Sequence, residues 1–331
     1  LRAPSGHEQL IRRALLAELK DMGLDPQLDR MGNVVVVKQG TKGADAPRVM
    51  VAAHMDEVGL LVANATEEGF LRTLPVGGVD SRVVISKRVL CGDEAIPGVI
   101  GAMAIHLQTA EDRKHVLSYD DIYVDIGAKD KAEAESKCPK GTYITFDTDY
   151  VEFGEGCVSA KALDDRVGCY NLLRVLKEEY PCTVVAVFTS EEEVGCRGAA
   201  TVGQAIGAGT VIVLEATTAG DIPGAPKSRV ACRVGAGAVV SFMDGGTVYP
   251  RELIELAMAT AGEKGIRAQL KELVAGGNDA SAYQRAAAGA RVLALSAPVR
   301  YIHSACSVAK IDDLEQVYAL ANALAERSFD K

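Results

Sequence analysis

The sequence contains no tryptophan, few other aromatic residues and no long apolar run. Aromatic side chains make up 5% of the 331 residues, so the chain has few surfaces on which a sugar chain could stack. Its apolar runs are all shorter than the roughly 18 residues that a membrane-spanning helix needs. These absences argue against a polysaccharide-binding protein and against insertion into a membrane.

Basic residues are in deficit as well, and they form no cluster. The chain has 36 lysines and arginines against 45 aspartates and glutamates, which gives a net charge of -9. A negative chain repels the phosphate backbone of nucleic acids, whose binding depends on basic side chains. We therefore expect no nucleic-acid partner.

The eight cysteines include no C-x-x-C pair. Their spacing therefore indicates neither a disulfide framework nor a structural zinc site. Unpaired thiols persist in a reducing compartment, so we expect a cytoplasmic protein.

Short apolar runs rich in β-branched residues alternate with helical patterns along most of the chain. The runs are too short and too continuous for surface helices and are typical of strands buried on both faces. They lie at 33–37, 49–53, 183–189, 210–214 and 292–295. Helical patterns lie at 165–179, 250–264 and 311–329, and Ser5 and Glu8 form a capping-box pattern before a first helix. This alternation predicts an α/β fold.

The stretch from 64 to 155 has a different pattern. Short alternating segments at 82–90, 122–126 and 142–146 are separated by glycine and proline, as in a small β domain. We therefore expect one α/β domain, formed by residues 1–63 and 156–331, with a β-rich domain inserted at 64–155. Residues 109–120 are polar and lack a period, so we expect a mobile loop there.

Acidic and histidine residues follow the predicted buried strands. His54, Glu191 to Glu193, Glu215 and His303 each come at or after the end of such a run. In open α/β sheets the carboxyl ends of the strands form the ligand crevice. A polar strand end explains any one of these residues without a function, but coincidence at four strand ends favours a site.

Three consecutive glutamates, 191–193, are the sharpest chemical signal. Like charges about 4 Å apart repel by about 1 kcal/mol in water and by about 4 kcal/mol near a protein surface. The nearest basic residue in the sequence is Arg197, which does not match three carboxylates. A divalent metal would match them, and histidine with carboxylate is a ligand set of Zn²⁺, Co²⁺ or Mn²⁺. A solvated acidic turn is the alternative.

Five segments, taken in order, resemble the motifs of a known enzyme family. They lie at 53–59, 161–166, 192–199, 276–280 and 300–304. Together they resemble the TET, or glutamyl aminopeptidase-like, family of dinuclear metal aminopeptidases, some relatives of which carry cellulase-like labels. The resemblance implies a zinc-peptidase-like α/β/α catalytic domain with a mixed sheet and an inserted small β-barrel-like domain.

The resemblance also implies a pair of divalent metal ions in each chain, zinc or cobalt, with manganese as a further possibility. The implied ligands are His54 and Glu215 at one ion, Glu193 and His303 at the other, and Asp164 between them.

Other site residues follow from the same resemblance. Glu192 is implied as the general base that acts on a water bridging the metals, and the peptide between Asp164 and Asp165 is implied to be cis. Asp56 lies two residues beyond His54, on the same side of an extended segment, where it can orient the imidazole. Asp279 is a candidate substrate contact, in a motif where Asn278 replaces the threonine that the family usually has.

The predicted function is an aminopeptidase that removes amino-terminal residues from short peptides. The resemblance implies a homo-oligomer, a tetrahedral dodecamer, and we expect its subunits to meet through the inserted domain. Two alternatives stay open. Paired carboxylates can also cleave sugars, as in a cellulase-like glycoside hydrolase, and a metal-binding assembly protein needs no catalysis, although an unligated Glu192 argues against it.

Overall fold

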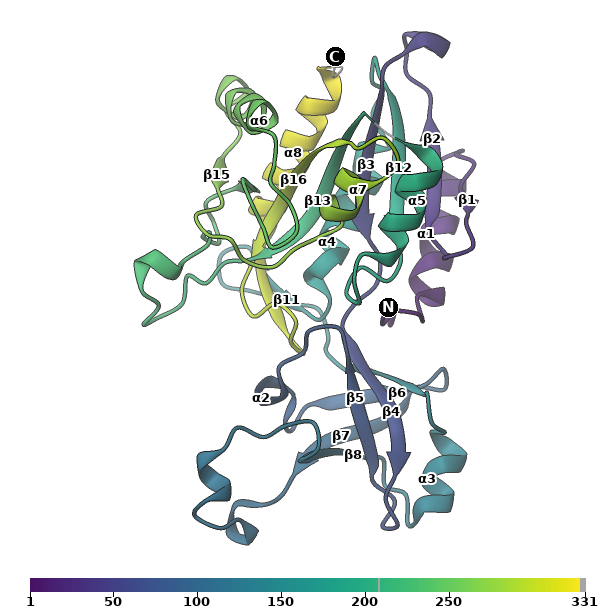
Figure 1. The fold of residues 1–331 in the computed structure, drawn as a ribbon, viewed down its shortest axis with the longest axis vertical. Coiled ribbons are helices and arrows are strands. Elements are labelled where there is room, and N and C mark those ends of the chain that lie inside the picture. Colours follow the sequence, from purple (N-terminus) through teal and green to yellow (C-terminus); the bar gives the residue numbers. More distant parts are fainter. Residues whose placement is uncertain (208, 328–331) are drawn as a thin grey trace.

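The computed structural model describes residues 1–207 and 209–327. Within these ranges the strands form an eight-stranded sheet, a three-stranded sheet and a closed six-stranded barrel. Figure 1 shows that the large sheet and most of the helices form one lobe, and that the barrel forms a second lobe at the other end of the molecule. The α/β class with a barrel-like module is confirmed.

The large sheet is mixed, with a parallel centre. The four central strands β12, β3, β13 and β16 run parallel, β2 is antiparallel to β12, and β14 is antiparallel to β16 but parallel to β15. The order across the sheet is β1 (Gln27–Leu28), β2 (Val34–Lys38), β12 (Thr183–Thr189), β3 (Arg48–His54), β13 (Thr210–Thr218), β16 (Arg291–Val299), β14 (Ala238–Val240) and β15 (Ala268–Leu270).

Helices cover both faces of this sheet, because side chains of the central strands alternate between two cores. In β3, Val49 and Val51 join one core while Met50 and Ala52 join the other. The first core is covered by α1 (Gln9–Asp21), α4 (Leu163–Val175), α6 (Arg251–Lys264) and α8 (Ile311–Glu326). The second is covered by α5 (Arg197–Ile206) and α7 (Ala280–Arg285). The continuous apolar runs of the sequence reflect this two-sided burial.

Several predicted boundaries need correction. The strand predicted at 210–214 continues to Thr218, and the one predicted at 292–295 continues to Val299. The helix predicted at 165–179 ends at Val175. The helix predicted at 311–329 is α8, which ends at Glu326, and residues 328 and 329 lie outside the described ranges.

The predicted capping box is wrong. The Ser5 hydroxyl does not cap α1 but donates to the buried Asp56 Oδ2 over 2.6 Å. Glu8 occupies the cap position itself, and its Oε1 accepts from the Gly6 amide. A carboxylate is a stronger acceptor than a neutral group, so Ser5 serves Asp56 in place of the helix end.

The barrel contains a compact apolar interior. Its strands, in order around the barrel, are β4 (Gly59–Ala65), β5 (Leu71–Val76), β8 (Ile122–Asp125), β7 (Ile96–Ala102), β6 (Arg88–Cys91) and β9 (Tyr143–Phe146). The interior includes Leu60, Leu71, Ile100, Ile122 and Ile144, each at most 1% exposed. Helix α3 (Lys131–Lys137) packs beside β4.

The inserted segment differs from expectation in its first strand and in where the barrel begins and ends. The pattern at 82–90 is not one strand, because Asp80 caps a helical turn, α2 (Ser81–Val84), before β6 begins at Arg88. The barrel begins at Gly59, ahead of residue 64. Its last strand ends at Phe146, and β10 (Val151–Phe153) pairs instead with β11 (Cys157–Ala160) and, through it, with β17 (Ser307–Lys310). The division into folding domains stays a prediction, as does mobility of 109–120.

A helix that crosses a bilayer needs about 20 predominantly apolar residues. None of the helices in the described residues is long and apolar enough to cross a membrane.

Candidate active site

The site lies at the carboxyl edge of the parallel strands. His54 is the last residue of β3, and the loop that carries Glu193 follows β12. Glu215 was predicted to end its strand but lies inside β13, because that strand continues to Thr218. His303 lies in the turn after β16. Asp164 enters from the start of α4, where its backbone is not helical and the following peptide is cis. Parallel strands end at one edge, so these side chains converge.

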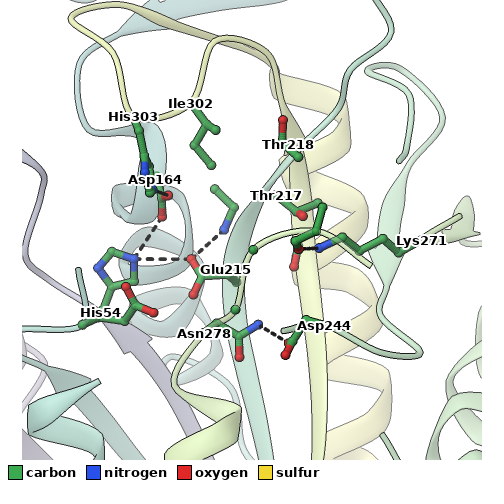
Figure 2. Close-up of a pocket in the computed structure, with 16 residues that line it drawn as sticks. His54, Asp164, Glu215, Thr217, Thr218, Asp244, Lys271, Asn278, Ile302 and His303 are labelled. Atoms are coloured by element: carbon green, nitrogen blue, oxygen red, sulfur yellow. Dashed lines mark hydrogen bonds and ion pairs between the residues drawn. The ribbon is translucent and has the colours of Figure 1, made fainter. Parts of the chain in front are cut away.

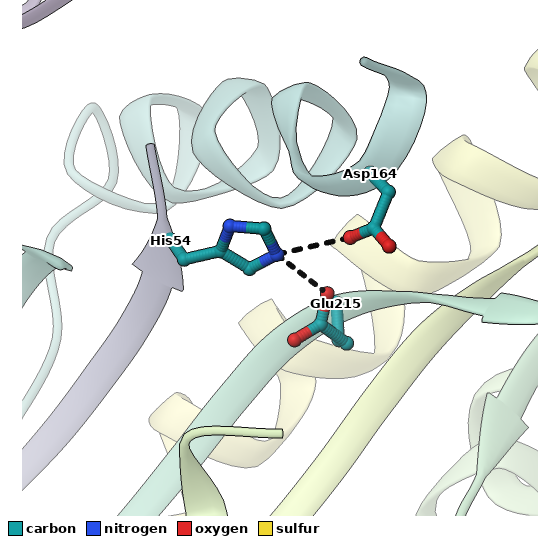
Figure 3. Close-up of side chains that lie close together, drawn as sticks. All are labelled: His54, Asp164 and Glu215. Carbon is teal, nitrogen blue, oxygen red and sulfur yellow. Dashed lines mark hydrogen bonds and ion pairs between the residues drawn. The ribbon is translucent and has the colours of Figure 1, made fainter. Parts of the chain in front are cut away.

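One group of donor atoms is centred on His54. Its Nε2 lies 2.9 Å from Asp164 Oδ1 and 3.4 Å from Glu215 Oε1 (Figure 3). The three donor atoms lie within 4.8 Å of one another, a spacing that suits a single ion. Histidine and carboxylate donors in a buried site are typical of a transition metal.

A second group shares Asp164 with the first. His303 Nε2 lies 3.2 Å from the other oxygen of Asp164, Oδ2, and 3.3 Å from Glu193 Oε2. The opposite ring nitrogen of His303 donates to Gly78 O over 3.2 Å, so the loop beyond the barrel strand β5 orients this imidazole. The structure thus brings all five predicted ligands together, and their role as ligands stays a prediction.

Asp56 lies two residues beyond the end of β3 and is fully buried. Its Oδ1 accepts from the amide of Glu192 at 3.0 Å and its Oδ2 from the amide of Glu193 at 3.2 Å. Its Oδ1 also lies 3.4 Å from His54 Nδ1, an ion-pair distance without hydrogen-bond geometry. Asp56 therefore positions the glutamate loop as well as facing the imidazole.

The three consecutive glutamates separate into two environments. Glu191 faces Arg197, with 3.0 Å between their charged atoms, and lies outside the two donor groups. Glu192 lies in neither group with a histidine but in a third cluster with Cys196 and Asp279. The thiol of Cys196 donates to Glu192 Oε1 at 3.5 Å. The acidic turn is solvated only in part, at Glu191.

Asp279 is buried and lies close to Glu192. Its Oδ2 accepts from the Thr189 hydroxyl, and the side chain is part of the cluster with Glu192. Burial raises the pKa of Asp279 to about 6. Among the described residues that line the adjacent cavity is Asn278, not Asp279. A direct substrate contact by Asp279 therefore stays a prediction without support from the cavity wall.

The carboxyl groups of the site are crowded in a poorly solvated space. Burial and the neighbouring carboxylates raise the pKa values of Glu192 and Glu193 well above the usual range. Burial together with Asp164 raises the pKa of Glu215 to about 7. Burial alone would lower the pKa of His54, but Glu215 and its other acidic neighbours raise it well above normal. For the carboxyl groups, burial is the larger cause and repulsion between like charges adds to it.

Protein cations do not balance this charge. In the described part of the chain, four carboxylates form ion pairs with the two histidines: Asp56, Asp164, Glu193 and Glu215. Glu192 forms no ion pair there, and none of these five carboxylates pairs with a lysine or arginine. Buried anions without a counter-charge cost several kcal/mol or are neutralised. The donor set therefore fits divalent cations.

A cavity of about 340 Å³ opens beside the donor groups. His54, Asp164, Glu215 and His303 line one side of it (Figure 2). Thr217, Thr218, Asp244, Lys271 and Asn278 line the other side. Sequence patterns did not single out Lys271 or Asp244, because both come from connecting segments without a metal-ligand spacing.

Comparison with known proteins identifies the family. A family model described as M42 glutamyl aminopeptidase matches residues 32–320. The chain belongs to this family. It is a metal-dependent aminopeptidase, a hydrolase of peptide bonds.

Three relatives of this M42 chain illustrate the match. A putative aminopeptidase of Acetivibrio thermocellus is 36% identical, over 96% of this chain and 92% of the relative. The lysyl aminopeptidase of Pyrococcus furiosus is 32% identical, over 97% and 93%. A solved structure of the Pyrococcus horikoshii TET1 peptidase has a TM-score of 0.86 at 32% identity, over 98% of this chain and 96% of that one. That peptidase is described as assembling into a tetrahedron or a large octahedral shell.

The glutamate loop of the M42 chain is fixed by a buried asparagine that sequence patterns missed. Asn33 Oδ1 accepts from the Ser190 amide at 2.9 Å, and its Nδ2 donates to Gly198 O at 3.1 Å. A Cβ on Gly198 would collide with Asn33 Oδ1 and with the backbone of Ser190. The position of Asn33, directly before a buried strand, was the available signal.

We predict that Gly198→Ala lowers the free energy of unfolding by about 1–3 kcal/mol, because overpacking must displace Asn33 or Ser190. Activity should fall too, since Glu192 and Glu193 follow Ser190. Gly262→Ala is the matched control: that glycine is also helical, but open space surrounds its Cβ position. The control should gain about 0.5–1 kcal/mol. Denaturant titration measures the free energy of unfolding of both variants. Equal changes in the two would contradict the packing argument.

Proposed function

We propose that this M42 enzyme is a dinuclear metallo-aminopeptidase that removes amino-terminal residues from short peptides. The observation that supports it best is the position of Asp164. Its two oxygens face two separate groups, one with His54 and Glu215 and one with His303 and Glu193. A carboxylate shared in this way is suited to bridge two ions.

Two divalent ions per chain match the charge of the proposed ligands. The ligand carboxylates Asp164, Glu193 and Glu215 supply three negative charges, against four positive charges on the ions. Zinc or cobalt suits the mixed histidine and carboxylate donors, and manganese is a further candidate. When bound, such ions acidify a water molecule and polarise the scissile carbonyl.

Glu192 is the proposed general base. It is adjacent to Glu193 in sequence, but its carboxylate belongs to neither histidine group. Its carboxylate takes a proton from the attacking water and passes it to the amine that leaves. Asp56 holds the amides of Glu192 and Glu193, and thereby keeps the base and the proposed ligand in a fixed relation.

The two alternatives from the sequence, a glycoside hydrolase and a non-catalytic assembly protein, do not agree with membership of the M42 aminopeptidases. The purified enzyme should release p-nitroaniline from aminoacyl p-nitroanilides and should leave a soluble cellulose intact. Inactivity on the p-nitroanilides with metal bound would contradict the proposed mechanism.

We predict that Glu192→Gln lowers kcat by at least about a hundredfold, because an amide cannot accept the proton. Metal content should stay near two ions per chain. Glu191→Gln is the matched control, since the neighbouring carboxylate faces Arg197 and should be dispensable for turnover. Initial rates and elemental analysis on the same samples decide. Retention of most turnover in Glu192→Gln would exclude it as the base.

A second prediction concerns the bridge. Asp164→Ala should reduce metal at both positions, whereas Glu215→Ala should reduce it at one, because Glu215 belongs to a single group. Elemental analysis after dialysis against a fixed low metal concentration distinguishes the two patterns. If Asp164→Ala loses one ion and fully retains the other, Asp164 is an ordinary ligand.

We also propose a cytosolic homo-oligomer that assembles through the inserted segment at 64–155 as a tetrahedral dodecamer. Apolar side chains are exposed on the loop between β7 and β8: Met103 at 54%, Ile105 at 68%, Leu107 at 66% and Val116 at 65%. Such a cluster is typical of a contact surface. The eight cysteines are free, which suits a reducing compartment.

Light scattering coupled to size exclusion tests the assembly. We expect a dodecamer for the unaltered chain and smaller species for the double variant Ile105→Glu with Leu107→Glu, because buried charges would oppose the contact. A dimer would contradict the dodecamer alone. A fully active monomer at assay concentration would contradict assembly altogether.

A further inference from the structure

A third cluster of donor atoms lies beside the two donor groups and has no metal-binding role in the proposed mechanism. It consists of Glu192, Cys196 and Asp279, whose donor atoms lie within 4.8 Å of one another. Glu192 also lines the cavity of about 340 Å³, and Cys196 is partly exposed. A small ion can therefore reach the third cluster from the cavity.

Asp279 contributes to this cluster a carboxylate that is only half satisfied. The residue is 1% exposed. Its Oδ2 accepts from the Thr189 hydroxyl at 2.5 Å, whereas its Oδ1 is buried and has no hydrogen-bond partner among the described residues. A buried carboxylate oxygen without a donor is unfavourable, and a ligand that supplies positive charge relieves it.

A second buried polar atom without a partner lies on the same helix. The Tyr283 amide donates to Asp279 O at 3.1 Å, so one turn separates the two residues. The Tyr283 hydroxyl has no hydrogen-bond partner within the described ranges. After burial, Asp279 and Cys196 raise the pKa of this hydroxyl most, which indicates that both lie near it. The hydroxyl can donate to a water molecule bound at the third cluster.

Basic side chains do not balance the third cluster. Arg197 directly follows Cys196, but it pairs with Glu191 at 3.0 Å. In the part of the chain that the structure describes, neither Glu192 nor Asp279 forms an ion pair with a lysine or arginine. Two carboxylates and a thiol thus converge without a cation from the protein.

We propose that Glu192, Cys196 and Asp279 form a third, inhibitory metal site that takes Zn²⁺ when zinc is in excess. The thiol releases its proton to solvent, and the thiolate and both carboxylates bind the ion. The inhibition rests on the proposed function, because a Glu192 carboxylate bound to zinc cannot accept a proton from water. The binding itself does not depend on that role.

The geometry and the donor types suit zinc. A tetrahedral zinc ion holds a sulfur and an oxygen ligand about 3.5 Å apart. The thiol of Cys196 lies 3.5 Å from Glu192 Oε1. A thiolate selects Zn²⁺ over Mg²⁺ and Ca²⁺, which prefer oxygen ligands, and three protein ligands leave a fourth position for water.

The cost of ionising the thiol makes this site weaker than the two donor groups. Burial raises the pKa of Cys196, and Asp279 and Glu192 add to the shift. Zinc must therefore displace a firmly held proton before the thiolate can bind it. Repulsion from the two ions of the proposed dinuclear centre opposes a third ion further. Occupancy is thus expected only after the dinuclear centre is full.

The first test uses the unaltered enzyme with two ions per chain. Added Zn²⁺ should lower kcat by at least about tenfold, and elemental analysis should show a third ion over the same concentration range. With Co²⁺ as the probe, a thiolate-to-cobalt charge-transfer band should appear with the third ion, because no proposed ligand of the two donor groups contains sulfur. Absence of the band, or full turnover with the third ion bound, would overturn the proposal.

The second test removes the thiol. Cys196→Ser should abolish the cobalt band and raise the zinc concentration for half inhibition by at least about tenfold, because a hydroxyl is a poor zinc ligand. Cys157→Ser is the matched control, since that thiol is also partly exposed but belongs to none of the three clusters. It should keep the band and the inhibition. Unaltered zinc inhibition in Cys196→Ser would overturn the proposal.

Asp279→Asn provides a second variant if Cys196→Ser does not fold. It should weaken the cobalt band and the zinc inhibition together, and inhibition equal to that of the unaltered enzyme would again overturn the proposal. The band and the third ion are measured without substrate. Absence of turnover on every aminoacyl substrate would therefore contradict the proposed function, whereas a missing band in an active enzyme would contradict only the third site.

Discussion

Carboxylates gathered in a space with little water repel one another, and this repulsion governs the carboxyl edge of the large sheet. The acidic side chains there outnumber the two histidines that contact them, and burial together with this crowding raises the pKa values of Glu192, Glu193 and Glu215. Such a cluster either takes up protons or receives positive charge from outside the polypeptide. The mixed histidine and carboxylate donors fall into two groups that share Asp164, and both groups fit the metal dependence of the M42 family.

The surrounding structure holds these repelling groups in place with neutral donors. Asp56 is held by the Ser5 hydroxyl and by the amides of Glu192 and Glu193. The same loop is anchored at its start by Asn33. On the far side, a carbonyl at Gly78 orients His303. Segments from the amino terminus, the barrel side and the carboxyl-terminal part of the chain therefore all converge on one site.

The parts of this design that depend on local pattern could be predicted from the sequence. Two-sided burial makes the central strands continuous apolar runs, so the ends of β3 and β12, and with them the positions of His54 and the glutamate loop, could be predicted. The end of the strand that carries Glu215 was predicted too early, because β13 continues past its apolar run to Thr218. Features that depend on distant partners could not be predicted. The local sequence predicts that Ser5 caps a helix, because its contact with Asp56, 51 residues away, cannot be seen there. Lys271 belongs to no motif, and its place in the cavity lining depends on segments that are distant in sequence.

The barrel strands are contiguous in sequence, whereas the neighbours of β3 are not. Every barrel strand lies between Gly59 and Phe146, but β3 pairs with β12 and β13, which are synthesised after the whole barrel. At about 5–20 residues per second, the chain between Phe146 and Thr218 takes on the order of ten seconds to emerge from the ribosome. During that interval the apolar strand β3 has no partner strand on either edge, although all the barrel strands have been synthesised. Unpaired strand edges are an aggregation hazard, and the completed sheet removes it by pairing β3 on both sides.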